Sequence, residues 1–146
     1  YRGQEGTTAS SAAKLLSLGP TVRLLWFDWL PDGSGFLYVR TTKFGTVDFV
    51  EANLFEYQFA GGTITQLTHL NDEFVRSFDV SPDGQSIVFE RAATLDSPTA
   101  DLWIMNRDGS GLQKLVSNGR APNWGSATPV PPQLTPRISI PLVLGD

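Results

Sequence analysis

Two aspartates stand at equivalent places in a repeated segment, and their type and spacing make them the first candidates for chemistry. Asp28 lies in Phe27–Gly33 (Phe-Asp-Trp-Leu-Pro-Asp-Gly), and Asp79 lies 51 residues later in Phe78–Gly84 (Phe-Asp-Val-Ser-Pro-Asp-Gly). If the two copies surround a common axis, both carboxylates could line a channel and hold a cation or bind a basic partner. The alternative is that each aspartate accepts hydrogen bonds from nearby backbone N–H groups.

A second set of candidates lies in loops whose length and sequence differ between the copies. Variable loops on a repeated, rigid scaffold are a usual place for binding. We expect these loops at residues 42–52, 69–74, 92–100 and 117–121. The candidate partner-binding residues in them are Phe44, Phe49, Asp72, Glu73 and Arg120. The alternative is that these are ordinary solvated loops.

Patterns for catalysis or metal binding are weak. The single histidine, His69, falls in a loop, where a solvated side chain is the simpler interpretation, and there is no Gly-x-Ser-x-Gly nucleophile elbow. Asn106–Ser110 is faintly similar to a calcium-binding loop, but it lacks the later glutamate and falls on a hairpin turn. No pair of carboxylates stands out for glycoside hydrolysis. We therefore predict no catalytic residue, no metal site and no cofactor.

Composition limits the class of protein. Of the 146 residues, 40% are hydrophobic and 18% are charged, so a core can form in one ordinary domain. The net charge is −4 and no Lys/Arg cluster is present, which argues against nucleic acid as a partner. No apolar run approaches the roughly 18 residues of a membrane span, and the lack of cysteine removes disulfides and thiolate sites. The start at Tyr1 suggests a processed or partial chain.

The repeat extends well beyond the two Pro-Asp-Gly segments. A second block recurs at an offset of 48, with Asn53–Phe55 on Asp101–Trp103 and Ile64–Leu67 on Leu112–Leu115. Each copy reads as four strands, the first of which ends at Pro-Asp-Gly, a sequence that favours a tight turn. The second strands are predicted at 35–41 and 85–91 and the third at 53–59 and 101–106, and the fourth strands end near residues 67 and 115.

Apolar residues occupy both parities along these strands, as in Phe36–Val39 and Leu102–Met105. A sheet with one face in water would alternate strictly, so each sheet is expected to be covered on both faces. Four-stranded sheets stacked around a ring meet this requirement. The predicted fold class is therefore all-β, a β-propeller of four-stranded antiparallel blades, with an up-and-down sandwich as the alternative.

The second copy resembles the repeat of the TolB-like propellers. The resemblance rests on Val80–Gly84, Ile87–Phe89, Asp101–Gly111 and Pro122–Trp124, and it covers roughly residues 12–125. The first copy departs from the pattern, with Leu30 in place of serine and Phe59–Gly61 in place of the polar turn. The resemblance implies a parent of six blades, and it leaves function open, because such propellers serve as binding scaffolds, peptidase gates and lyases.

Two repeats are too few to close a ring. We expect the last strand of a preceding blade and a linker at 1–20, blades at 21–69 and 70–117, the first strand of a further blade at 118–127, and a Pro-rich tail at 128–146. The tail reads either as a linker with a short apolar strand, similar to the ends of some secreted bacterial surface proteins, or as a segment packed along the propeller's side. The chain is then the C-terminal part of a longer propeller, or copies of it assemble into a ring.

The leading functional hypothesis is a non-catalytic binding or scaffold module that acts outside the cytoplasm, in the periplasm, at the cell surface or after secretion. Its partners would be other propeller blades, from a longer chain or from copies of itself, and a protein. One alternative is the propeller domain of a prolyl-oligopeptidase-like peptidase, whose serine, aspartate and histidine would lie in a further domain. Another alternative is a carbohydrate-binding or lyase propeller, for which exposed aromatic residues and a metal on the loop face are expected.

Overall fold

The computed structural model describes residues 22–41 and 51–125, and every regular element in these two ranges is a β-strand. The strands form two antiparallel units of four, which we name blade 1 and blade 2. The predicted strands at 35–41 and 101–106 are confirmed, whereas those at 53–59 and 85–91 are each displaced by one residue. Blade 1 contains β1 (Arg23–Trp29), β2 (Gly35–Thr41), β3 (Ala52–Gln58) and β4 (Ile64–Gln66), and blade 2 contains β5 (Phe74–Val80), β6 (Ser86–Ala92), β7 (Asp101–Asn106) and β8 (Gln113–Val116).

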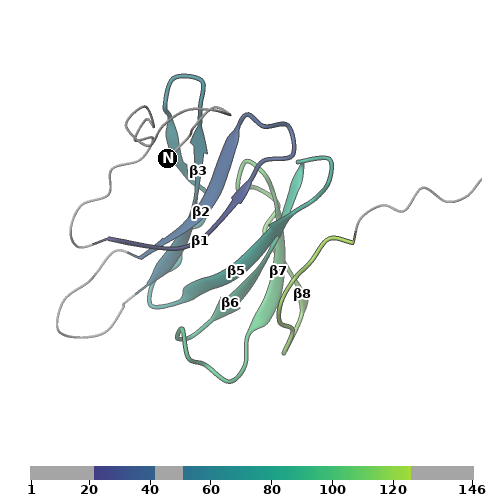
Figure 1. The fold of residues 1–146 in the computed structure, drawn as a ribbon. Coiled ribbons are helices and arrows are strands. Elements are labelled where there is room, and N and C mark those ends of the chain that lie inside the picture. Colours follow the sequence, from purple (N-terminus) through teal and green to yellow (C-terminus); the bar gives the residue numbers. More distant parts are fainter. Residues whose placement is uncertain (1–21, 42–50, 126–146) are drawn as a thin grey trace, which may run out of the picture.

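Within each blade, every strand pairs with the next one in the sequence, so each blade is an antiparallel meander. The first strands of the two blades, β1 and β5, lie next to each other (Figure 1). A single parallel pair, Ala52 with Phe74, joins the sheets, and the Ala52 N–H donates to the Glu73 carbonyl at 3.2 Å. The two blades are therefore joined into one hydrogen-bonded path only at this bridge between β3 and β5.

Both Pro-Asp-Gly segments form the tight turns that their residue types predict. Gly33 has a φ of +69° and its N–H donates to the Leu30 carbonyl at 2.9 Å. Gly84 has a φ of +70° and its N–H donates to the Ser81 carbonyl at 2.7 Å. Glycine suits this place because a positive φ is costly for residues that have a Cβ.

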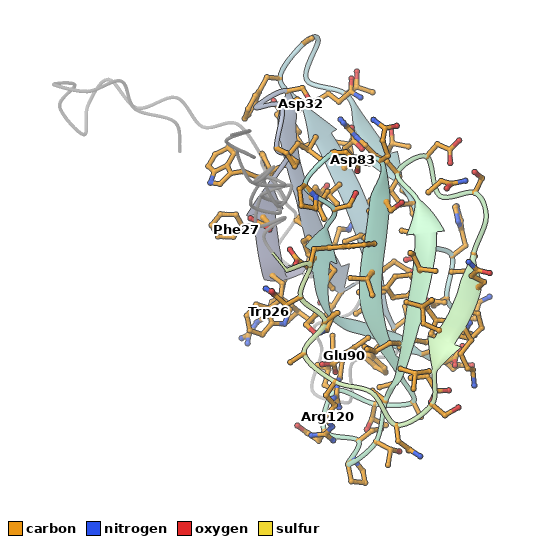
Figure 2. The ribbon with its side chains drawn as sticks, turned by 90° about the vertical axis from the view of Figure 1, so that its right-hand side faces the viewer. Trp26, Phe27, Asp32, Asp83, Glu90 and Arg120 are labelled. Atoms are coloured by element: carbon orange, nitrogen blue, oxygen red, sulfur yellow. The ribbon has the colours of Figure 1, made fainter. Side chains whose placement is uncertain are left out.

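The aspartate of each turn also holds the backbone that follows it. The Ser34 hydroxyl and N–H donate to Asp32 Oδ1 at 2.6 and 2.8 Å, and these bonds, the hydroxyl bond first, lower the pKa of Asp32 to about 2. Asp83 accepts from Ser81 and from the Gln85 N–H in the same way, and its pKa is also lowered. Asp32 and Asp83 lie at the same end of the two sheets (Figure 2).

One hydrophobic core lies between the blades. Leu37 and Val39 from β2 and Phe89 from β6 are 0% exposed, and they belong to one cluster that spans both sheets. Burial of this size is the main term that stabilises such an arrangement. The cluster consists of Leu30, Leu37, Val39, Ala52, Leu54, Leu67, Leu70, Phe74, Val75, Val80, Ile87, Phe89 and Met105.

The other side of blade 1 is aromatic. Phe36 stacks on Tyr57 with ring centroids 5.1 Å apart, and Tyr38 stacks on Phe55 at 5.6 Å. These four residues form a second buried cluster, distinct from the core between the blades. Strand β2 is thus apolar on both faces, which confirms the expectation drawn from its imperfect alternation.

An ion-pair cluster joins the blades next to their shared core. Arg107, which follows β7, donates to Glu56 on β3 at 2.9 and 3.2 Å and to Asp32 at 3.2 Å. The Glu56 side chain is 6% exposed and that of Arg107 is 22% exposed. Hydrogen bonding to Glu56, opposed by burial, raises the pKa of Arg107. The pair therefore ties blade 1 to blade 2 by a charge-assisted contact.

Candidate functional site

Three large aromatic side chains of β1 are exposed, and we name them the β1 aromatic strip. Trp26, Phe27 and Trp29 are 57%, 61% and 51% exposed. Phe27 pairs with Tyr38 and Trp29 with Phe36 across the β1–β2 ladder, so both lie on the aromatic side of blade 1. Figure 2 shows Trp26 and Phe27 projecting away from the sheets along one edge. Exposed apolar side chains that lie together on a soluble protein commonly mark an interaction surface.

The repeat shows what this surface lacks. Phe27 and Trp29 correspond, at the offset of 51, to Phe78 and Val80 of β5. Val80 is 7% exposed and Phe78 packs on the core between the blades. The positions that blade 2 buries against its neighbour are therefore left open in blade 1.

Two hydrogen-bond donors on the same side of blade 1 lack an acceptor. The Tyr38 hydroxyl and Arg40 Nε are buried atoms without a hydrogen-bond partner. The Arg40 guanidinium lies over the Phe55 ring, 4.9 Å from its centroid. Burial raises the pKa of Tyr38, against the opposing charge of Arg40. A buried donor without an acceptor costs free energy, so these atoms suit a partner that brings oxygen acceptors.

The segment that follows β8 crosses the far side of blade 2. Ala121 N–H donates to Glu90 Oε1 at 2.6 Å, and Trp124 N–H donates to Asp79 Oδ2 at 2.5 Å. Asp79 alternates with core residues along β5 and so points away from blade 1. Two carboxylates thus fix the backbone of the crossing segment. A strand at 118–127 stays a prediction, because residues up to 125 form none and the remainder lies outside the described ranges.

Glu90 also pairs with Arg76, and this arrangement gives a testable pH dependence. Burial alone would raise the pKa of Glu90, but hydrogen bonds from the Ala121 N–H and from Arg76, whose Nη2 lies 2.7 Å from the carboxylate, lower it overall from its ordinary 4.5. A carboxyl with a lowered folded-state pKa contributes stability above its unfolded pKa, and that stability is lost as pH falls through the folded value.

We expect Glu90→Gln to remove this contribution. The difference in unfolding free energy between the wild type and the variant should be largest above about pH 5 and should shrink toward pH 3. Urea unfolding followed by tryptophan fluorescence across this range measures it. A difference that stays constant with pH would contradict the assignment of Glu90 as the group that anchors Ala121.

The two aspartates predicted from the repeat have local backbone contacts. Asp28 Oδ1 accepts the Trp29 N–H at 2.8 Å, and Asp79 Oδ1 accepts the Val80 N–H at 3.0 Å. Within residues 22–41 and 51–125, no three His, Asp or Glu side chains are grouped as a metal site would require. Binding of a cation or a basic partner by Asp28 and Asp79 stays a prediction.

The candidate partner-binding residues in the loops make different local contacts. Asp72 has a positive φ of +56°, and Glu73 accepts hydrogen bonds from Arg91. Arg120 donates to the carbonyls of Ser97, at 3.0 Å, and Pro98. Arg120 lies at the end of the sheets opposite the Pro-Asp-Gly turns (Figure 2). Phe44 and Phe49 fall outside the described residues, and partner binding by this set stays a prediction.

One cleft opens between the blades, and another lies within blade 2. A cleft of about 590 Å³ lies at the turn end and is lined mostly by polar groups, among them Gln58, Asn106 and Arg107. A second cleft of about 300 Å³ contains Trp103, with Arg91 and Lys114 over its ring at 4.7 and 5.8 Å. Both cations in the second cleft are already paired with carboxylates, so it offers no free charge to a ligand.

No family model matches the chain. A curated relative, the Tol-Pal system protein TolB of Anaeromyxobacter dehalogenans (strain 2CP-C), is 31% identical over 99 residues, which are 66% of this chain. Over these 99 residues the chain is similar in sequence to a TolB propeller, in agreement with the resemblance of its repeat. The matched residues make up 20% of the relative, so the chain spans about a fifth of its length.

Solved structures agree on the fold of this TolB-like chain. An oligogalacturonate lyase in complex with manganese matches with a TM-score of 0.54 and 17% identity, over 72% of this chain and 26% of that one. A protein of Bacteroides ovatus ATCC 8483 assigned as a dipeptidyl aminopeptidase IV matches with a TM-score of 0.50 and 12% identity, over 70% of this chain and 20% of that one. At such identities the likeness shows the fold alone, and it confirms the predicted propeller class.

In the described part of the chain, no helix has the length and apolar character needed to cross a membrane. His69 is exposed. The features that sequence reasoning missed are the β1 aromatic strip and Arg40. The signal for Arg40 was available, because the arginine recurs as Arg91 at the offset of 51.

Proposed function

We propose that this TolB-like chain is a non-catalytic propeller module that works through protein–protein or assembly contacts. The observation that carries the proposal is the exposure of Phe27 and Trp29 at places where blade 2 is buried against a neighbour, with Trp26 exposed between Leu25 and Phe27 on the same strand. Trp and Phe are common anchors at the centres of protein interfaces. The partner is another propeller blade, from a longer chain or from a second copy, laid on the aromatic side of blade 1.

A location outside the cytoplasm is part of this proposal. It is supported by the 31% identity to a Tol-Pal system protein and by the resemblance of the repeat to TolB-like propellers. The proposal treats the exposed apolar strip as an interface, because a surface of this kind left in water promotes uncontrolled association.

Sedimentation velocity over a range of concentrations tests the proposal. The wild type should associate, and a β1 variant with Trp26→Ser, Phe27→Ser and Trp29→Ser should raise the dissociation constant at least about thirtyfold, which corresponds to the loss of about 2 kcal/mol at a set of interface anchors.

A matched control removes exposed apolar residues elsewhere. Leu112, Leu115 and Val116, in and beside β8, are 45%, 52% and 47% exposed, so replacing them with serine removes comparable surface from the outer edge of blade 2. This control should associate like the wild type. A monomeric wild type would contradict assembly from copies of the chain, and equal weakening by both variants would contradict the β1 aromatic strip as the interface.

A carbohydrate-binding propeller is the second candidate, because exposed aromatic residues also stack on sugars and a lyase shares the fold. Titration with oligogalacturonate, followed by tryptophan fluorescence, separates the two candidates. A saturable change that the β1 variant loses would favour the sugar, whereas no change would favour assembly.

A further inference from the structure

One arginine recurs at the same place in both blades. Arg40 on β2 and Arg91 on β6 are 51 residues apart in the repeat. The Arg40 guanidinium lies 4.9 Å from the Phe55 ring centroid, and that of Arg91 lies 4.7 Å from the Trp103 centroid. The two blades thus build the same arginine-on-aromatic arrangement from equivalent strands.

In blade 2 this arrangement includes a carboxylate. Arg91 Nε donates to Glu73 Oε2 at 3.0 Å, and Arg91 Nη2 donates to the same oxygen. Glu73 immediately precedes β5, whose first residue pairs with the residue after Arg91. The acid therefore reaches the arginine from the neighbouring strand of the same blade.

In blade 1 the equivalent place carries no acid. The residue that precedes β1 is Val22, the counterpart of Glu73. Arg40 Nε is buried and has no hydrogen-bond partner. A charged donor in such a place favours a carboxylate acceptor, since bonds between ionised groups are the stronger ones.

We propose that Arg40 binds a carboxylate brought by the partner that packs on the aromatic side of blade 1. The proposal rests on the proposed function and names the chemistry of that partner: an Asp or Glu followed by apolar residues. Glu73, which is followed by Phe74 and Val75, shows the pattern within this chain. The apolar residues would cover the β1 aromatic strip, and the acid would pair with Arg40.

Whether Arg40 can accept an acidic partner at this place is tested in the chain alone. Val22→Glu restores the acid of blade 2 and should increase the folding equilibrium constant about two- to fivefold, the effect of a partly exposed ion pair. In an Arg40→Gln background the gain should vanish. No gain, or the same gain in both backgrounds, would overturn the proposal, because Arg40 would then already be satisfied. Urea unfolding of the four proteins measures the cycle.

A peptide pair tests recognition of the partner. The probe is a synthetic copy of residues 68–76 (Thr-His-Leu-Asn-Asp-Glu-Phe-Val-Arg), and its match carries Gln in place of Glu73. The wild type should bind the Glu peptide about fivefold more tightly, as observed by fluorescence polarisation. Arg40→Gln and Val22→Glu should abolish the preference, and Lys114→Gln, at an exposed lysine of β8 that pairs with Asp101 in blade 2, should keep it.

Equal binding of the two peptides, or binding of neither up to millimolar concentration, would overturn the Arg40 proposal. Separate experiments test the Arg40 site and the β1 aromatic strip. The Val22–Arg40 cycle reports on Arg40 alone, whereas loss of association in the β1 variant reports on the aromatic strip. A positive cycle with a monomeric wild type would leave the Arg40 site standing and remove self-assembly.

Discussion

Phe89→Ala should destabilise the whole chain by about 3–5 kcal/mol, the range found when a large core aromatic is truncated. Phe89 is 0% exposed and lies in the cluster that both blades share. Removing it leaves a cavity between the sheets, and both sheets lose packing. We therefore expect a single urea transition at a lower midpoint with an unchanged slope.

Phe27→Ala is the matched control for this prediction. Phe27 is 61% exposed and belongs to the β1 aromatic strip, so its truncation should change the unfolding free energy by no more than about 0.5 kcal/mol. Two separate transitions, or a small effect of Phe89→Ala, would show that the blades do not share a core.

Arg107→Met should cost about 2–3 kcal/mol. The change leaves Glu56, whose side chain is 6% exposed, without its charged partner. Breaking a buried pair by removing one ion typically costs 3–5 kcal/mol, and we reduce this figure because the Arg107 side chain is 22% exposed and faces a cleft.

The double variant Glu56→Met, Arg107→Met shows whether the cost of Arg107→Met comes from losing the ion pair or from leaving a buried, unpaired carboxylate. If the cost of Arg107→Met arises from the unpaired Glu56 carboxylate, the double variant should recover much of the stability, because no buried charge remains. Additive effects of the two single changes would contradict a direct coupling across the blades.

Local sequence features predicted much of the fold. Pro31, Asp32 and Gly33 gave the turn, because each has a conformational preference that needs no distant contact. The run Phe36–Val39 predicted that both faces of its strand are buried, because side chains alternate along a strand and the residues on both faces are apolar. Because each copy of the repeat reads as four strands, the sequence also predicted that β1–β4 and β5–β8 form equivalent blades.

Contacts that one copy has and the other lacks could not be predicted. Arg107 corresponds to Phe59, and Glu90 corresponds to Val39, so the repeat gave no sign of either ion pair. The exposure of Trp26 and Trp29 was also missed, because aromatic residues in strands usually indicate burial. Exposure depends on which neighbour covers a face, and that is a property of assembly rather than of local sequence.

Hydroxyl-radical footprinting of the native protein, purified from its own source, measures whether a partner covers the aromatic side of blade 1. The rates of oxidation at Trp26, Phe27 and Trp29 are compared with those at Leu112 and Leu115, which have similar exposure. If a blade-like partner covers the aromatic side of blade 1, Phe27 and Trp29, which lie on that side, should be protected at least about fivefold relative to their exposure in the structure. Oxidation at the rate that 51–61% exposure implies would contradict the account.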